Sequence, residues 1–132
     1  GNLGSQSRMN YTVVGDSVNL ASRLEGVNKI YKTEIIVSSD TRDAAEKEFL
    51  FRPLGSVAVK GKQQQVEIYE LVESMTQATE EQIQFSEKFT TALNLFQDGD
   101  FLGAKKLFSK IGDQYLTDHP TQIYLGKCLE KE

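Results

Sequence analysis

The length, composition and charge of the chain exclude several classes of protein. Its 132 residues suffice for one modest domain or for a small domain with an appendage, and 39% of them are hydrophobic, as is usual in globular proteins. A net charge of −4 lacks the basic excess of nucleic-acid-binding domains, so we expect no nucleic-acid partner. No apolar run approaches the roughly 20 residues of a membrane-spanning helix, and no signal peptide is visible.

The single cysteine and the single histidine limit the chemistry further. Cys128 cannot form an internal disulfide, which favours a reducing, cytoplasmic location. Without other Cys or His residues, Cys128 and His119 do not make a metal site. We therefore expect no metal ligand among these residues.

The N-terminal part predicts a loop, a strand and a helix. Residues 1–7 are rich in Gly and Ser, and residues 9–14 (MNYTVV) are aromatic and β-branched, which favours a strand. Asp16 or Ser17 can cap the helix that follows, because a short oxygen side chain accepts from the free N–H groups of a first turn. Since the sequence starts without Met just before this patterned segment, we expect it to be a piece of a longer protein.

The middle of the chain predicts further short elements in a mixed order. This mixture indicates an α+β fold with antiparallel strands rather than a regular βαβα series. In chain order, the sequence predicts a strand at 34–38, a helix at 41–47, an extended piece at 49–54 interrupted by Pro53, and two strands at 56–60 and 66–72 joined by a polar turn.

The last part of the chain predicts a linker and a helical tail. Residues 74–84 are mostly polar and indicate the linker. Residues 85–132 predict three helices, with a turn at Gly99-Asp100 and with Pro120 in the first turn of the third helix. The pattern resembles a helix-turn-helix repeat of the tetratricopeptide (TPR) type, which stacks on neighbours. We expect a TPR-like tail whose aromatic residues form a packing surface, with a protein as its partner.

A polar block near the N-terminus contains the candidates for chemistry. Asn19 and Arg23 lie four residues apart on the predicted helix and share one face, and Thr12 lies on the preceding strand. With Lys60 at a predicted turn, they suit a phosphate-bearing ligand, because guanidinium and ammonium groups neutralise phosphoryl oxygens. Spacing alone leaves other readings open. Arg23 could pair with Glu25, Asn19 could lie on a helix surface, and Lys60 could be a solvated lysine.

Two stretches of sequence resemble the class III adenylate and guanylate cyclase catalytic domains. Residues 1–25 (GNLGSQSRMNYTVVGDSVNLASRLE) are similar to the second half of that domain, and residues 51–71 (FRPLGSVAVKGKQQQVEIYEL) are similar to its closing strands. The resemblance covers residues 1–73 and implies a partial, ferredoxin-like cyclase domain. It also implies the conversion of ATP to cyclic AMP and pyrophosphate in intracellular signalling, with GTP as the other possible substrate.

The resemblance implies roles for four residues. As catalytic residues, Arg23 would offset charge on the phosphoryl oxygens and Asn19 would orient the ribose while its 3′-oxygen attacks the α-phosphate. As substrate-binding residues, Thr12 would contact the base and Lys60 the terminal phosphates. In this family the site lies at a dimer interface, so a homodimer is expected.

The resemblance also implies cofactors that this sequence does not hold. The family binds two Mg²⁺ or Mn²⁺ ions through aspartates that we expect upstream of Gly1, and Asp16 is interpreted as a cap. We expect the chain alone to be inactive, and the protein to be cytoplasmic or the cytosolic part of a membrane-anchored receptor. A second hypothesis is a non-catalytic nucleotide-binding or regulatory module with a protein-interaction tail.

Overall fold

Residues 35–58 and 64–132 are described by the computed structural model, and they belong to two units of the chain. The first unit is Gly1–Gln77 and the second is Ala78–Glu132. Within the described ranges, no helix combines the length and apolar character needed to cross a membrane.

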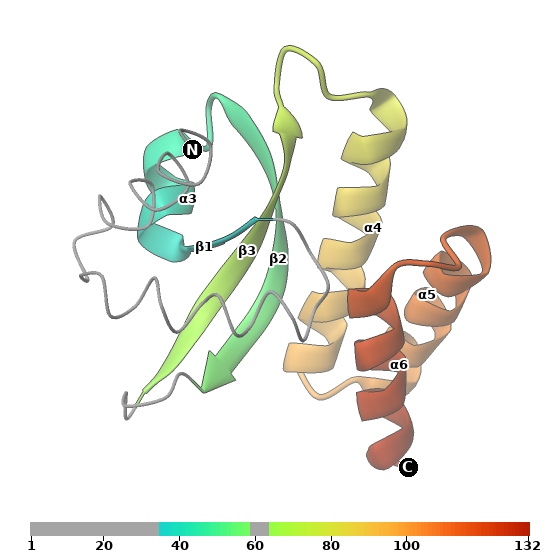
Figure 1. The fold of residues 1–132 in the computed structure, drawn as a ribbon. Coiled ribbons are helices and arrows are strands. Elements are labelled where there is room, and N and C mark those ends of the chain that lie inside the picture. Colours follow the sequence, from blue (N-terminus) through green and yellow to red (C-terminus); the bar gives the residue numbers. More distant parts are fainter. Residues whose placement is uncertain (1–34, 59–63) are drawn as a thin grey trace. The chain divides into compact units, whose positions relative to one another are not determined.

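The described residues of the first unit contain an antiparallel sheet of three strands in the order β1-β3-β2 (Figure 1). Ile36, Val37, Leu54 and Ile68 are almost completely buried and form its apolar core, as expected of β-branched and aliphatic residues on strands. The α+β class predicted from the sequence is therefore confirmed. Among the described residues of this unit, the elements are β1 (Ile36–Ser38), α3 (Ser39–Ala45), β2 (Phe49–Ala58) and β3 (Gln65–Ser74).

Strand β2 differs from its prediction because it continues through Pro53. Pro53 pairs with Tyr69 and Gly55 pairs with Ile68, so Leu54 is an extra residue at a β-bulge. Gly55 has φ of +96°, a left-handed conformation that glycine adopts without a steric penalty. A bulge tolerates proline, which has no N–H to donate to a ladder. The predicted interruption at Pro53 is therefore wrong, and the bulge turns Leu54 into the core.

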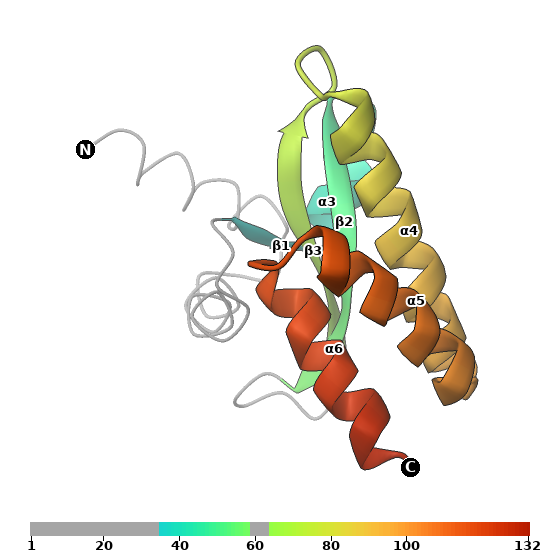
Figure 2. The same cartoon turned by 90° about the vertical axis from the view of Figure 1, so that its right-hand side faces the viewer.

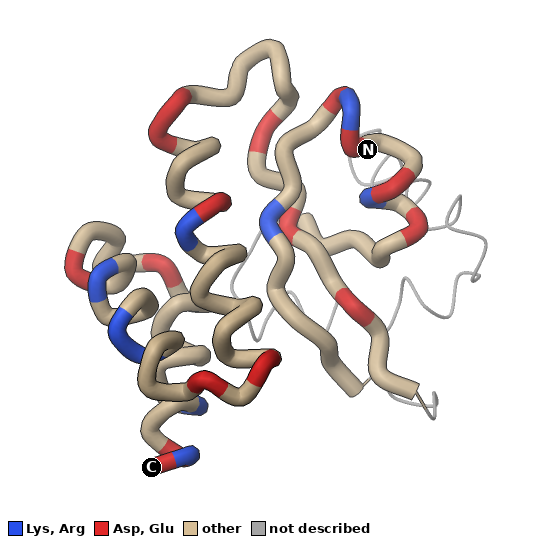
Figure 3. The backbone as a smooth tube through the Cα atoms, turned by 180° about the vertical axis from the view of Figure 1, so that it is seen from behind, with Lys and Arg blue, Asp and Glu red and all other residues tan. Residues whose placement is uncertain are grey.

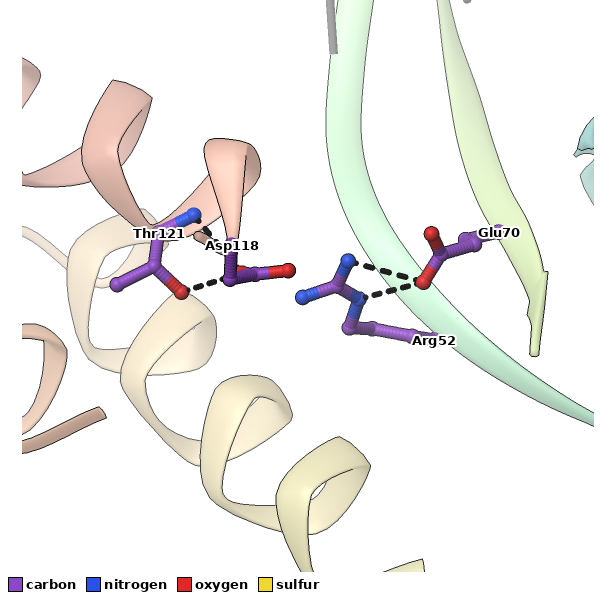
Figure 4. A network of polar contacts seen from close by, with 4 residues as sticks. All are labelled: Arg52, Glu70, Asp118 and Thr121. Atoms are coloured by element: carbon purple, nitrogen blue, oxygen red, sulfur yellow. Dashed lines mark hydrogen bonds and ion pairs between the residues drawn. The ribbon is translucent and has the colours of Figure 1, made fainter. Parts of the chain in front are cut away.

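A charged pair joins β2 and β3. Arg52 is 1% exposed, and its partner Glu70 lies directly opposite on β3. The Glu70 Oε1 accepts from Arg52 Nε at 3.0 Å and lies 2.9 Å from Nη2 (Figure 4). A buried guanidinium is costly unless it is paired and hydrogen-bonded, so this contact helps to fix the register of the hairpin.

Replacing Glu70 tests this contact. We expect Glu70→Gln to lower the free energy of unfolding of the first unit by about 2 kcal/mol, because a charge-assisted bond to a buried cation becomes a weaker, neutral one. The matched change Glu67→Gln, at an exposed position on the same strand, should cost less than about 0.5 kcal/mol. Urea denaturation measures both. Equal values for the two variants would contradict a stabilising role for the pair.

The second unit contains the three helices predicted from the sequence. They are α4 (Glu80–Gln97), α5 (Phe101–Gln114) and α6 (His119–Glu130). The side chain of Asp100 caps α5 by accepting from the N–H of Gly103 at 2.9 Å. Asp118 caps α6 by accepting from the backbone N–H and the hydroxyl of Thr121, at 3.1 Å and 2.6 Å (Figure 4).

Helix α4 begins within the segment expected to be a linker, residues 74–84. Thr79 and Gln82 form a capping box in which each side chain accepts from the other residue's backbone N–H, at 3.1 Å and 2.9 Å. This reciprocal cap satisfies free donors of the first turn and starts the helix at Glu80 despite its polar sequence. The stretch between the last strand and this helix is therefore shorter than expected.

An aromatic cluster joins the three helices, whose backbones are drawn in Figure 2. The ring of Phe89 on α4 lies 5.4 Å from that of Phe108 on α5 and 6.1 Å from that of Tyr124 on α6. Phe108 and Tyr124 stack at 5.4 Å, and Phe96 contacts Tyr124 at 5.3 Å. These packing distances are typical of favourable aromatic pairs. The second unit therefore has its own core, built from the aromatic periodicity seen in the sequence.

Two glycines of the second unit should respond in opposite directions to the same substitution. Gly99 has φ of +90° between α4 and α5, so Gly99→Ala should lower the free energy of unfolding by about 1 kcal/mol through backbone strain. Gly126 lies inside α6 with open space around it, so Gly126→Ala should raise that free energy by about 0.5–1 kcal/mol. Thermal unfolding followed by circular dichroism measures both, and shifts of the same sign would contradict the assigned conformations.

Candidate functional site

The residues predicted to bind and act on a nucleotide lie outside the described part of the structure. Lys60 falls between the last residue of β2 and the first residue of β3. The assigned roles therefore stay predictions. The four residues are Thr12, Asn19 and Arg23, within 1–34, and Lys60, within 59–63.

The β2–β3 hairpin is the described part of the structure that flanks Lys60 in the sequence. Its ladder runs from the pair Phe49–Ser74 to the pair Ala58–Gln65, so the ends of the two strands next to Lys60 lie side by side (Figure 1). The buried pair of Arg52 and Glu70 lies within this ladder. An arginine inside an apolar run was a sequence signal for a structural ion pair, but it did not indicate the partner.

A second cation of the first unit is also held by neighbouring side chains. The guanidinium of Arg42 lies over the ring of Tyr69, 4.5 Å from its centroid, and its Nε lies 2.8 Å from a carboxylate oxygen of Asp43. Burial raises the pKa of Tyr69, and the nearby Arg42 charge opposes that rise. The contact of Arg42 with Tyr69 therefore links α3 to β3, and the guanidinium charge interacts with side chains of the fold itself.

The described residues offer little for acid, base or metal chemistry. Among them, no group of three or more His, Cys, Asp or Glu residues could hold a metal ion. Cys128 is 1% exposed, and burial raises the pKa of its thiol, so the reactive thiolate is disfavoured. The metal ions implied by the resemblance do not fit these residues, and we assign no step to a metal in this part of the chain.

A groove between α4 and α5 was not predicted from the sequence. Its volume is about 370 Å³. The signal was present in the spacing, since the α5 positions follow i, i+3, i+4 and i+7 and the α4 positions are three apart, which places each set on one helix face. The lining residues are Lys88 and Thr91 on α4, and Leu107, Lys110, Ile111 and Gln114 on α5.

Comparison with protein families decides the class of the first unit. Residues 1–73 match the adenylate and guanylate cyclase catalytic domain. The chain belongs to this family. The match covers both stretches on which the resemblance was based, and it ends one residue before the end of β3 at Ser74. The described sheet is therefore part of a cyclase catalytic domain.

Curated relatives match either the cyclase part or nearly the whole chain. Adenylate cyclase 1 of Rhizobium meliloti (strain 1021) is 43% identical over 72 residues, and the adenylate cyclase of Anabaena cylindrica is 42% identical over 74, each covering 54% of this chain. The terminal-differentiation-specific adenylate cyclase of Dictyostelium discoideum is 31% identical over 134 positions that cover 98% of this chain. The last match therefore extends through the helical unit.

The chain is short compared with these relatives. It spans 11% of the Rhizobium protein, 15% of the Anabaena protein and 6% of the Dictyostelium protein. No solved structure matches the chain.

Proposed function

We propose that the full-length protein is an adenylate cyclase that converts ATP to cyclic AMP and pyrophosphate in intracellular signalling. The observation that carries the proposal is the motif of residues 11–25 within a family match over residues 1–73. The names of the Rhizobium, Anabaena and Dictyostelium relatives support adenylate rather than guanylate cyclase.

The proposed roles of the helix residues follow from where charge develops. As the ribose 3′-oxygen attacks the α-phosphate, negative charge grows on the phosphoryl oxygens, and the guanidinium of Arg23 is suited to stabilise it. The amide of Asn19, one helical turn away, is suited to hold the ribose in line. Electrostatic stabilisation and positioning supply most of the rate in phosphoryl transfer.

The proposed substrate contacts lie on either side of this helix in the sequence. The hydroxyl of Thr12 can accept from the amino group of adenine, and it can also donate to another base. ATP is therefore preferred without strict exclusion of GTP. The ammonium of Lys60 would neutralise the terminal phosphates that leave as pyrophosphate.

Divalent cations are part of the proposal. When bound, Mg²⁺ or Mn²⁺ would polarise the attacking and leaving oxygens. The proposed enzyme is a cytoplasmic homodimer, or the cytosolic part of a larger receptor, in which residues 1–73 contribute to the catalytic domain. The helices α4, α5 and α6 would then form a TPR-like tail.

Product formation by the full-length protein tests this function. We expect cyclic AMP from ATP with Mg²⁺ or Mn²⁺, and less cyclic GMP from GTP, both measured by chromatography of the nucleotides. Parallel assays with each nucleotide and each metal give the base preference directly. If neither nucleotide yields a cyclic product while the protein is folded and dimeric, the proposed activity is wrong.

A second candidate function is favoured by the helical unit. In this alternative the cyclase-like domain binds a nucleotide without turnover and regulates a protein held by the tail. The groove between α4 and α5 supports a binding role for the tail. Saturable nucleotide binding without any cyclic product would favour this alternative over the enzyme.

A further inference from the structure

The groove between α4 and α5 has a cation on each wall. Lys88 projects from α4 and Lys110 from α5, and the lining residues include no carboxylate. The chain as a whole carries a net charge of −4, so the lining of the groove has a charge of the opposite sign to that of the whole chain. Figure 3 shows that acidic positions occur at both ends of α4 and elsewhere on the second unit. The lining of the groove is therefore basic, while Glu87 and Asp113 lie near its two lysines in the sequence but outside the lining.

The two lysines of the groove, like Lys106, have no charged partner among the residues that the structure describes, whereas Arg42, Arg52 and Lys105 each have one. Arg52 pairs with Glu70, and Lys105 pairs with Glu132. Both groove lysines are exposed, so their ammonium groups can be reached by a carboxylate from another molecule. A ligand that supplied two such carboxylates would gain two charge-assisted contacts.

The floor of the groove is apolar. Ile111 is 3% exposed and Leu107 is half-buried, and both come from the same face of α5. The hydroxyl of Thr91 already donates to the backbone carbonyl of Glu87 at 3.0 Å. A volume of about 370 Å³ is at the low end for ligand sites, and it suits one or two apolar side chains better than a whole domain.

We propose that this groove binds an acidic amphipathic segment of a partner protein. One or two apolar side chains of the segment pack on Leu107 and Ile111, and carboxylates on either side of them pair with Lys88 and Lys110. Charge complementarity with the two lysines favours an acidic occupant. The apolar floor favours an amphipathic peptide segment over a small phosphate ligand, because phosphate would make no contact with that floor. This proposal deepens the role of the tail and is independent of cyclase chemistry.

Peptide selection against the 132-residue chain tests the proposal. Random displayed peptides of about 12 residues are selected on the chain, and the enriched sequences are synthesised with a fluorescent label for anisotropy titrations. We expect enrichment of peptides that combine Asp or Glu with Leu, Ile or Phe. Lys88→Glu and Lys110→Glu should each weaken their binding by about tenfold or more, and rising salt should weaken it as well.

The matched control is Lys106→Glu, the same charge change at an exposed position of α5 outside the groove lining. It should weaken the binding less than either groove variant does, because Lys106 lies one helical turn before Lys110 but outside the lining, so it makes no direct pair with the segment. Circular dichroism of each variant checks folding, and Lys88→Gln repeats the test with a smaller change in charge.

Several results would overturn the proposal. These are enrichment of neutral or basic peptides, no enrichment at all, or equal losses in Lys88→Glu and Lys106→Glu. A second copy of the chain could also occupy the groove, and sedimentation velocity detects this self-association. If the chain self-associates and Lys88→Glu abolishes the association, the occupant is a second copy and not a partner peptide. Cyclic AMP formation is assayed separately, so a failure of the groove proposal leaves the proposed enzyme activity standing, and the reverse also holds.

Discussion

Arg23→Ala in the full-length protein is expected to lower kcat for cyclic AMP formation by about 10²–10³-fold while KM for ATP changes little. The reason is that the guanidinium is proposed to act on charge that develops only in the transition state, and removing one such donor typically has this effect. Asn19→Ala should lower kcat by about 10²-fold through loss of ribose positioning. Initial rates over a range of ATP concentrations separate kcat from KM.

Two further variants make this result specific. Arg23→Lys keeps the charge but loses the forked donor geometry, so its kcat should lie between those of the wild type and Arg23→Ala. Lys47→Ala removes an exposed cation of the first unit and should leave kcat within about twofold. If Arg23→Ala and Asn19→Ala turn over ATP as fast as Lys47→Ala does, the proposed roles on this helix are wrong.

The order of the described elements could be predicted because local pattern and tertiary packing agree. The short apolar run at 34–38 predicted β1, and the aromatic repeat from Phe85 predicted the helical tail. The path of β2 could not be predicted, since Pro53 is a strong break signal and only pairing with β3 shows that a bulge accommodates it. The sequence did contain a signal for the start of α4, the Thr79–Gln82 capping box, but the surrounding polar residues favoured a linker.

For the candidate site, too, some residues could be predicted from the sequence and others could not. Asn19, Arg23, Thr12 and Lys60 were predicted from their fit to a family motif, and they stay predictions, whereas spacing alone left a surface role open for them. The buried Arg52 pairs with Glu70, which is 18 residues away in the sequence and meets it through the hairpin register. A family motif therefore predicts the residues for the chemistry, whereas the contacts made by packing are known only from the structure.

The groove is also a product of packing. Lys88 and Lys110 belong to different helices, and their positions on opposite walls depend on how α4 and α5 pack. A helical pattern gives the face of each helix, but it does not give the crossing that brings two faces together. The sequence therefore indicated a packing surface in the tail without indicating a binding site.

Phe108→Ala is expected to destabilise the helical unit by about 3–5 kcal/mol, the usual cost of truncating a buried phenylalanine. Phe108 is 0% exposed, and its ring contacts both Phe89 and Tyr124 at 5.4 Å, so its removal opens a cavity where all three helices meet. A unit this small has little stability to spare, and the loss should leave much of it unfolded at 37 °C. Loss of far-ultraviolet circular dichroism during urea denaturation measures the effect.

The control for this prediction lies on the same helix. Leu102 is 65% exposed near the start of α5, so Leu102→Ala should change the free energy of unfolding by less than about 0.5 kcal/mol. Phe108→Leu refills part of the cavity and should cost less than Phe108→Ala. If Phe108→Ala were as stable as Leu102→Ala, the aromatic cluster would not hold the three helices together. The walls of the α4–α5 groove would then need another source of rigidity, because α5 supplies both Phe108 to the core and Lys110 to the groove.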